Sequence, residues 1–232
     1  MPDRRCIEIL RKGVGAWNSW RQANPQVHPD LSETELSSLD LAGADLRGVV
    51  LRNADLCGAK LRGAEMQEAD LWDAKLEQAE MHGAHLHAAS LCRAHLEGAD
   101  LAEAELDHAD LWESDLEGAN LKGAHLEDAD LGGCNLDEAI LENAHLERAH
   151  LNVALLAGAR LGNAHLEEAH FGGANLARAD LSKAHLEGAK MRWARGLTQD
   201  QIDKAIGDEE TELPDDLQRP EHWCVKSGTA VG

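Results

Sequence analysis

Residues 144–153 read AHLERAHLNV, and residues 164–173, twenty positions later, read AHLEEAHFGG. Both stretches contain a period of five residues, in which Leu or Phe follows Ala by two positions. The period runs from Leu41 to Met191, where 27 of 31 positions are Leu and the others are Met66, Met81, Phe171 and Met191. Two residues before these positions, 27 of 31 residues are Ala, and the others are Leu39, Val49, Ser114 and Cys134. This period decides the fold.

The spacing excludes an amphipathic helix and favours short strands. A helix advances about 100° per residue, so a Leu at every fifth position would spiral around its whole surface. In a strand, the Ala and the Leu point to the same side, and the residue between them, the outward position, points to the other. The next Ala follows after an odd step, so the chain must turn at the two positions after each Leu, the first and second corner positions. Twelve of the 31 second corner positions are Gly, which suits a turn. The pattern predicts a coil of three-residue strands and corners with Ala and Leu inside.

Several side chains recur every twenty residues, which is four pentapeptides. His150 and His170 have this spacing, and ADLW at 69–72 recurs at 109–112. Two longer series share the interval: His125, His145, His165 and His185, and Glu127, Glu147, Glu167 and Glu187. A coil of four pentapeptides would stack these residues, and duplication of a twenty-residue unit explains the same spacing.

The repeats ADLRG, ADLCG, ANLKG, ADLGG and ANLAR follow the pattern A(D/N)LXX, and over residues 36–195 the chain resembles the pentapeptide repeat proteins. The resemblance implies an all-β fold: a right-handed quadrilateral β-helix of about eight coils. In this family, acidic members resemble duplex DNA in width and charge, and some bind DNA gyrase or topoisomerase IV and protect them from quinolones and other poisons. The residues expected in the core of this chain include Leu46, Leu86, Leu126, Leu166 and Phe171.

The flanks predict caps at both ends of the coil. Residues 1–30 form an expected helical cap and linker, because Ile7, Leu10, Val14 and Trp17 share one helical face over residues 4–23. The β-helix is expected over 31–197. In residues 198–232, Thr198 begins a capping-box helix expected to end at Gly207, and a partly disordered acidic tail follows. Solenoids need such caps. Pairing of two copies through an end cap is the alternative role.

The charge is strongly acidic and unevenly placed. The chain has 43 acidic and 22 basic residues, for a net charge of -21. With four pentapeptides per coil, the outward and corner positions fall on four faces with net charges of -1, -9, -1 and -5 around the coil. At ~4.8 Å per coil the stack is ~37 Å long, so its charge density is somewhat below that of duplex DNA but comparable with it. Direct nucleic-acid binding is disfavoured.

Candidate partner-binding residues lie on three of these faces. On the face of charge -9 they are Glu127, Glu147, Glu167 and Glu187. On the face of charge -5 they are Glu77, Glu97, Glu117 and Asp137. Trp72 and Trp112 form an outward column on a third face and are the aromatic candidates. Ladder packing of neighbouring side chains is the alternative role of the tryptophans.

The histidine column has three interpretations. It is a stack of mostly neutral rings on a solvated face, a pH-sensitive surface, or a weak site for Zn or Ni. His125, His145, His165 and His185 are the candidate metal ligands. We expect no dedicated metal site, because a flat, wet column has no closed coordination shell.

No sequence pattern of an enzyme occurs: there is no GxGxxG after a strand, GxxxxGK[ST], HExxH, GxSxG or CxxC. A filled Leu/Ala column leaves no pocket, so we expect no catalysis and no cofactor. No signal peptide or membrane span is expected, and five Cys without paired spacing suggest free thiols in the cytoplasm.

Two functions stay open. One is an acidic mimic of DNA that engages a protein partner such as a type II topoisomerase. The other is a scaffold module of unknown partner, tuned by pH through its histidines. Binding of the first kind weakens steeply with salt, and binding of the second kind does not.

Overall fold

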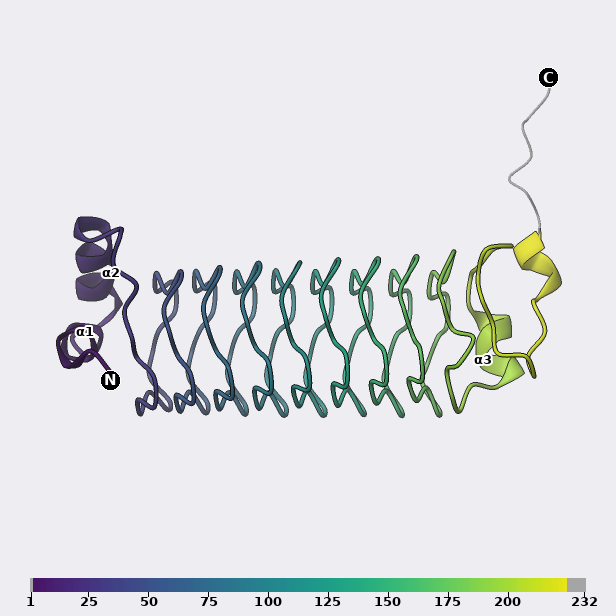
Figure 1. The fold of residues 1–232 in the computed structure, drawn as a ribbon, viewed down its shortest axis with the longest axis horizontal. Coiled ribbons are helices and arrows are strands. Elements are labelled where there is room, and N and C mark those ends of the chain that lie inside the picture. Colours follow the sequence, from purple (N-terminus) through teal and green to yellow (C-terminus); the bar gives the residue numbers. More distant parts are fainter. Residues whose placement is uncertain (1, 225–232) are drawn as a thin grey trace, which may run out of the picture.

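A computed structural model describes residues 2–224 as a straight stack of coils with a helical cap at each end (Figure 1). Helices α1 (Arg4–Leu10) and α2 (Val14–Ala23) cover the first coil. Helix α3 (Gln199–Lys204) and a 3-10 turn, η1 (Glu221–Cys224), lie at the other end. Within residues 2–224, no helix has the length and apolar character needed to cross a bilayer.

The coils are held together by parallel β-bridges with a constant step. Each outward position pairs with the residue twenty positions later, from Asp30 with Val50 to Asn175 with Arg195. The backbone N–H of His145 donates to Ala124 (2.9 Å), and its C=O accepts from Leu126 (2.7 Å). Four pentapeptides therefore make one coil, and residues twenty apart lie in one column.

The prediction of three-residue strands was too long. Between residues 2 and 224 the pairing consists of isolated bridges, and no longer strand forms. The reason is the corner on either side of each outward residue, which turns the chain before a second residue of the same edge can pair.

The interior is the predicted column of Leu and Ala. Leu46, Leu86, Leu126, Leu166 and Phe171 are fully buried. The interior is densely packed. The residues that replace Ala or Leu in it must therefore fit the same space.

Two of the interior substitutes are polar and satisfy each other. Ser114 and Cys134 occupy Ala positions in successive coils, with Oγ and Sγ 3.2 Å apart. The Cys134 thiol donates to the carbonyl of Leu111 at 2.9 Å. Burial raises the pKa of this thiol to about 12, so it stays protonated.

The corners have one uncommon feature. The second corner position has a positive φ, between 53° and 76°, at every fifth residue from Glu33 to Gly188. All twenty non-glycine residues with positive φ in the described chain occupy this position. An L-residue in this left-handed conformation costs about 1–2 kcal/mol relative to Gly, which explains the frequent Gly and Asn there.

The N-terminal cap differs from the expected single helix. Residues 4–23 form two helices because the chain reverses at Gly13, whose φ is 104°. Cys6, Leu10 and Trp17 are buried against the first coil, whereas Ile7 and Val14 are only partly buried. Only glycine adopts such a φ readily, so this one residue lets two short helices cover an end that one straight helix would only cross.

Side chains of α2 replace the backbone of a missing coil. The Asn18 amide donates to the carbonyl of Gly43 (2.9 Å) and accepts from the N–H of Asp45 (2.9 Å). The Trp17 indole donates to the carbonyl of Asp45 (2.8 Å), and Arg21 donates to that of Arg47 (2.6 Å). The first coil therefore has partners for backbone groups that would otherwise face no neighbour.

At the C-terminal end, the capping box of Thr198 and Gln201 is confirmed. The helix ends at Lys204 instead of Gly207, because Ile206 forms a bridge with His185 and continues the coil. The Gln201 side chain donates to the carbonyls of Leu176 (2.9 Å) and Ala179 (2.8 Å).

The segment after residue 208 is ordered as far as it is described. Glu212 bridges to Lys190, and Thr211 and Trp223 are buried. The Thr211 hydroxyl donates to the carbonyl of Leu186 at 2.8 Å. The expected disorder is therefore wrong for this part, and residues 225–232 lie outside the described chain.

Leu126 and Leu155 allow a matched test of the core. Leu126 is fully buried, whereas Leu155, at an outward position, is 43% exposed. We expect Leu126→Ala to lower the free energy of unfolding by about 2–5 kcal/mol, and Leu155→Ala to change it by less than about 0.5 kcal/mol. Denaturant unfolding followed by circular dichroism measures both. Equal effects would contradict the assignment of inward and outward positions.

The corner conformation can be tested at Val153, a β-branched residue with φ 55° and 62% exposure. We expect Val153→Gly to raise the free energy of unfolding by about 0.5–1 kcal/mol, because relief of the left-handed strain exceeds the entropy cost of Gly. Asn143→Gly is the control, since Asn tolerates this conformation, and its effect should be smaller. A destabilised Val153→Gly variant would show that the corner is not strained.

Candidate functional site

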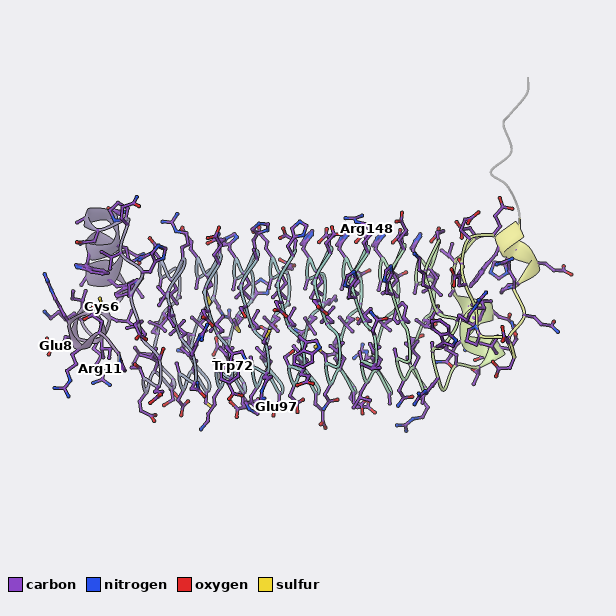
Figure 2. All side chains as sticks on the ribbon, viewed as in Figure 1. Cys6, Glu8, Arg11, Trp72, Glu97 and Arg148 are labelled. Carbon is purple, nitrogen blue, oxygen red and sulfur yellow. The ribbon has the colours of Figure 1, made fainter. Side chains whose placement is uncertain are left out.

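The face of charge -9, which surrounds the core positions Leu46, Met66 and every twentieth residue after them, is the most distinctive surface. We call it the acidic face, and its opposite, of charge -5, the second acidic face. Arg148 of the acidic face and Glu97 of the second acidic face lie at opposite edges of the stack in Figure 2. The register places these two charged surfaces back to back with the Leu/Ala column between them.

Four imidazoles on the acidic face form one continuous stack. We call His125, His145, His165 and His185 the histidine ladder. Successive ring centroids lie 4.7, 4.8 and 5.0 Å apart, and the rings are parallel to within 9°. The side chains are between about a third and half exposed, with 47% for His125 and 34% for His185. The coil repeat fixes this spacing, because the outward residues of adjacent coils are bridge partners.

A parallel series of carboxylates, the glutamate column, lies beside the ladder. It consists of Glu127, Glu147, Glu167 and Glu187. Each histidine Nδ1 lies near Oε1 of the glutamate two residues later, at 3.3, 3.4, 3.3 and 3.5 Å in order. The Nδ1 of His185 is also 3.9 Å from Oε1 of Glu167, in the preceding coil. The other oxygen, Oε2, of all four glutamates is buried and has no hydrogen-bond partner.

The first half of the acidic face has a different arrangement. His85 Nδ1 contacts Glu105 Oε2 in the next coil at 2.6 Å, and His87 contacts Asp107 in the same way. The ring of His87 meets His108 edge-on at a centroid distance of 5.6 Å. Here each imidazole is paired with a carboxylate of the following coil instead of stacking on another histidine.

Arg148 interrupts the negative charge of this face. It donates two hydrogen bonds to Asp128, at 2.9 and 2.6 Å, which lower the pKa of that carboxyl. A shallow hollow lies beside this ion pair, at the start of the histidine ladder, and its lining includes His108, His125 and Glu127. The hollow is open to solvent and has none of the dry, enclosed character of an enzyme pocket.

The candidate residues of the second acidic face are held mainly by local contacts. Glu77 accepts from the Cys57 thiol (3.0 Å), and Asp137 accepts from the N–H of Ala157 (2.6 Å). Glu117 accepts from the Asn135 amide (3.3 Å), and Glu97 lies 3.6 Å from His95. These carboxylates share a face but make no common site.

On the two nearly neutral faces, arginines pair with acids of the neighbouring coil. Arg62 pairs with Glu80 (3.1 Å) on one of them, and Arg52 pairs with Asp70 (2.6 Å) on the other. Arg160 pairs with Glu142 at 2.6 Å. Arginine also pairs with acids on the acidic face, where Arg47 contacts Asp45 (2.8 Å) and Arg148 contacts Asp128 (2.6 Å). The faces therefore differ in net charge because they hold different numbers of acids and bases.

Trp72 and Trp112 lie on one of the nearly neutral faces and are 37% and 46% exposed. The Arg93 guanidinium lies over the Trp72 ring at 5.4 Å. A side chain at Gly132 would meet Trp112 at 3.2 Å, so Trp112 lies against that glycine. The ladder packing expected as an alternative is therefore present, and part of each ring still faces solvent.

Sequence analysis missed Trp193, which is 73% exposed. It occupies the second corner position of the last repeat, in the same column as Val153 and Gly173. Val153 is 62% exposed and Leu155, across the corner, is 43% exposed. An apolar residue at a corner position that usually holds Gly or a polar residue is the signal that identifies this patch.

The same face carries a second pair of stacked imidazoles, His150 and His170, with centroids 5.0 Å apart. Burial lowers the pKa of His170, and the nearby charges of Lys190 and His150 add to this effect. Among the described residues, neither ring has an ion pair or hydrogen bond with a carboxylate. The pair is therefore a histidine stack without the glutamates of the ladder.

The predicted residues form three separate groups and not one site. The histidine ladder and the glutamate column come together on the acidic face. Glu77, Glu97, Glu117 and Asp137 lie on the opposite side of the coil, and the tryptophans lie on a face between the two. Among the residues described, the acidic face has most of the unpartnered carboxylate oxygens, Oε2 of its four stacked glutamates, and the second acidic face has one, Oε2 of Glu97.

Comparison with known proteins was made at the level of family, sequence and structure. The family model for pentapeptide repeats matches eight copies, over residues 40–78, 64–91, 79–118, 114–152 and 154–195. A search of curated protein sequences finds no significant match.

Three solved structures are similar. HetL, from the cyanobacterium Nostoc sp. strain PCC 7120 and involved in heterocyst differentiation regulation, is 30% identical over 88% of this chain and 98% of its own, with a TM-score of 0.48. QnrB1, a plasmid-mediated fluoroquinolone resistance protein, is 16% identical over 84% of this chain and 91% of its own, with a TM-score of 0.44. Rfr23 from the cyanobacterium Cyanothece 51142 is 30% identical over 49% of this chain and 63% of its own, with a TM-score of 0.32.

The TM-scores are below 0.5, so the assignment depends on the repeat model. The model covers most of the described coil, and its repeats coincide with the pentapeptides that form the bridges. The chain belongs to the pentapeptide repeat family.

Proposed function

We propose that this chain is a non-catalytic binding protein of the cytoplasm, whose right-handed, acidic β-helix engages a protein partner in place of DNA. A type II topoisomerase, DNA gyrase or topoisomerase IV, is the partner we put forward. The choice of this enzyme class follows from the family, some acidic members of which bind these enzymes. The charge pattern of this chain is what makes it a candidate for the same role.

The observation that carries the proposal is the placement of charge on two opposite faces. The faces of charge -9 and -5 are back to back, as the two phosphate backbones of a duplex flank its axis. The arginines that would weaken this pattern are mostly paired on the faces of charge -1. A groove lined by Lys and Arg would meet regularly spaced carboxylates every ~4.8 Å along either face.

The proposal predicts inhibition of gyrase that weakens steeply with salt. The experiment adds the purified full chain to a gyrase supercoiling assay, with and without a quinolone. We expect inhibition at low micromolar concentration, or relief of quinolone-induced cleavage, and a several-fold loss of affinity when the salt concentration rises from about 50 to about 200 mM. No effect on either reaction at any salt concentration would overturn the topoisomerase proposal.

Four glutamates at second corner positions provide a matched test of the face. Glu68 and Glu168 lie on the acidic face, and Glu103 and Glu113 lie one on each nearly neutral face; all four are exposed and have φ between 55° and 60°. We expect Glu68→Gln/Glu168→Gln to weaken partner binding several-fold and Glu103→Gln/Glu113→Gln to leave it almost unchanged. Both variants remove the same charge, so equal weakening would mean that only the net charge matters.

A second function, a scaffold that holds another protein through apolar contacts, is favoured by the exposed side chains described above. Trp72 and Trp112 supply one surface, and Val153, Leu155 and Trp193 supply another at the C-terminal end. The latter would also serve a contact between two copies through an end cap. Exposed aromatic residues are frequent in protein interfaces because they bury large areas at small entropic cost.

The scaffold function predicts binding that tolerates salt and depends on tryptophan. In pull-downs from a bacterial lysate, a partner retained at about 0.5 M salt and lost with Trp72→Ala/Trp112→Ala would support it. Trp193→Ala tests the C-terminal patch in the same experiment. A partner that is released by salt and unaffected by these variants would contradict the scaffold function and favour binding through the acidic faces.

A further inference from the structure

The histidine ladder and the glutamate column bring together three groups of potential metal ligands. They are His125, Glu127 and His145; Glu147, His165 and Glu167; and Glu167, His185 and Glu187. Within each group, one nitrogen or oxygen of every residue lies within 4.8 Å of the others. We propose that this ladder binds late first-row divalent cations, such as Zn²⁺, Ni²⁺ or Co²⁺, between successive coils of the acidic face.

The ligand types favour these metals over calcium and magnesium. The first group has two imidazoles and one carboxylate, a set that suits Zn, Ni and Co, whereas Ca²⁺ and Mg²⁺ prefer oxygen ligands alone. The other two groups have one imidazole and two carboxylates each, and they share Glu167. The first group is therefore the tightest expected site. The other two hold one ion between them unless Glu167 bridges two ions.

Metal binding requires the ligands of each group to draw together. With metal–ligand bonds of about 2.0–2.2 Å, two ligands of a tetrahedral ion lie about 3.3–3.6 Å apart. Nδ1 of His125 and Oε1 of Glu127 already lie 3.3 Å apart. The second imidazole, His145, is 34% exposed. Its ring must rotate out of the stack with His125 and His165 to direct a nitrogen at the ion.

Nδ1 is the nitrogen that faces the glutamates throughout the ladder. A neutral imidazole that binds a metal through Nδ1 carries its proton on Nε2, which can donate a hydrogen bond to water. Water would complete the coordination of each ion, because the protein supplies three ligands and the face is open. The sequence argued against a dedicated metal site because the column offers no closed shell of protein ligands. The site proposed here needs no such shell, because water supplies the remaining ligands.

The buried oxygens of the glutamate column are an independent observation that points to a cation. Oε2 of Glu127, Glu147, Glu167 and Glu187 is shielded from solvent and accepts no hydrogen bond. Four carboxylates stacked at the coil repeat also repel one another. Unpaired, shielded carboxylate oxygens are costly and uncommon. Cations between the coils would offset both costs, and protonated imidazoles are the competing explanation.

The pair His150 and His170 provides a control within the same chain. Its rings are stacked at nearly the same distance as those of the ladder, 5.0 Å. It has no paired carboxylate among the described residues, and Lys190 continues its column. Removal of either histidine pair deletes the same number of imidazoles, so only the acidic surroundings differ.

The test is a calorimetric titration of ZnCl₂ into the full chain, prepared without a polyhistidine tag and treated with a chelator. We expect about two ions to bind with micromolar affinity. His125→Gln/His145→Gln should remove the tighter one, and His150→Gln/His170→Gln should remove neither. Circular dichroism and the melting temperature without metal establish that each variant is folded.

Two further measurements distinguish a ligand set from a general attraction to negative charge. Co²⁺ bound through imidazole and carboxylate should show ligand-field absorption that His125→Gln/His145→Gln weakens and His150→Gln/His170→Gln does not. A large excess of Mg²⁺ should fail to displace Zn²⁺. Zinc binding that is equal in both variants, or that Mg²⁺ displaces, would overturn the proposal.

The inference is independent of the proposed function. The gyrase experiment uses Glu68 and Glu168, which are not ligands, and it can be performed with chelator-treated protein in zinc-free buffer. If the unsubstituted chain binds zinc but does not inhibit gyrase, the proposed function alone is contradicted. Unchanged inhibition with no zinc binding would contradict the metal ladder alone.

Discussion

The structure depends on one constraint, the parallel hydrogen bonds that join each outward residue to the residue twenty positions later. This register leaves the chain no freedom to choose its neighbours, because every side chain lies on its own equivalent in the next coil. Apolar equivalents make a dense interior, and charged equivalents make columns of like charge.

The repulsion within a column of like charge can be relieved only by the choice of residues in that column. Arginine relieves it on both the nearly neutral and the acidic faces. On the acidic face, histidine also alternates with, or stacks beside, the carboxylates. A single inserted pentapeptide would rotate everything after it onto the next face, so the surface pattern tolerates length changes only in whole coils.

The coil was predictable because its sequence signal is both local and periodic. The Ala and Leu positions identify the residues that lie inside, and the histidine and glutamate spacings identify the residues that stack. The caps were less predictable because tertiary contacts compete with local preference there. Ile7, Leu10, Val14 and Trp17 keep helical spacing across the break at Gly13, so the pattern alone indicates one helix. Glycine often follows the end of a helix, so Gly207 indicated a helix that ends there. Ile206 instead forms a bridge with the last coil, and the helix ends before it.

The candidate site was predictable in its register but not in its contacts. The sequence places four imidazoles in one column, and the structure stacks them. Which carboxylate each histidine meets depends on the next residue in the column. His85 has Glu105 above it and pairs across coils, whereas His125 has His145 above it and turns to Glu127 of its own coil. The buried glutamate oxygens follow from these side-chain orientations, which no spacing rule specifies. Trp193 was missed for a simpler reason: it does not recur. Trp72 and Trp112 share one column, whereas no other tryptophan lies in the column of Trp193.

The sealed ends of the stack have a consequence for the protein in solution. A coil with free N–H and C=O groups is the edge of a β-structure, and such edges recruit further chains into fibrils. Here the backbone carbonyls of the first and last coils accept hydrogen bonds from four side chains, those of Asn18, Arg21, Gln201 and Thr211. The stack therefore has a terminator at each end, and loss of either would leave an open edge that can pair with another chain.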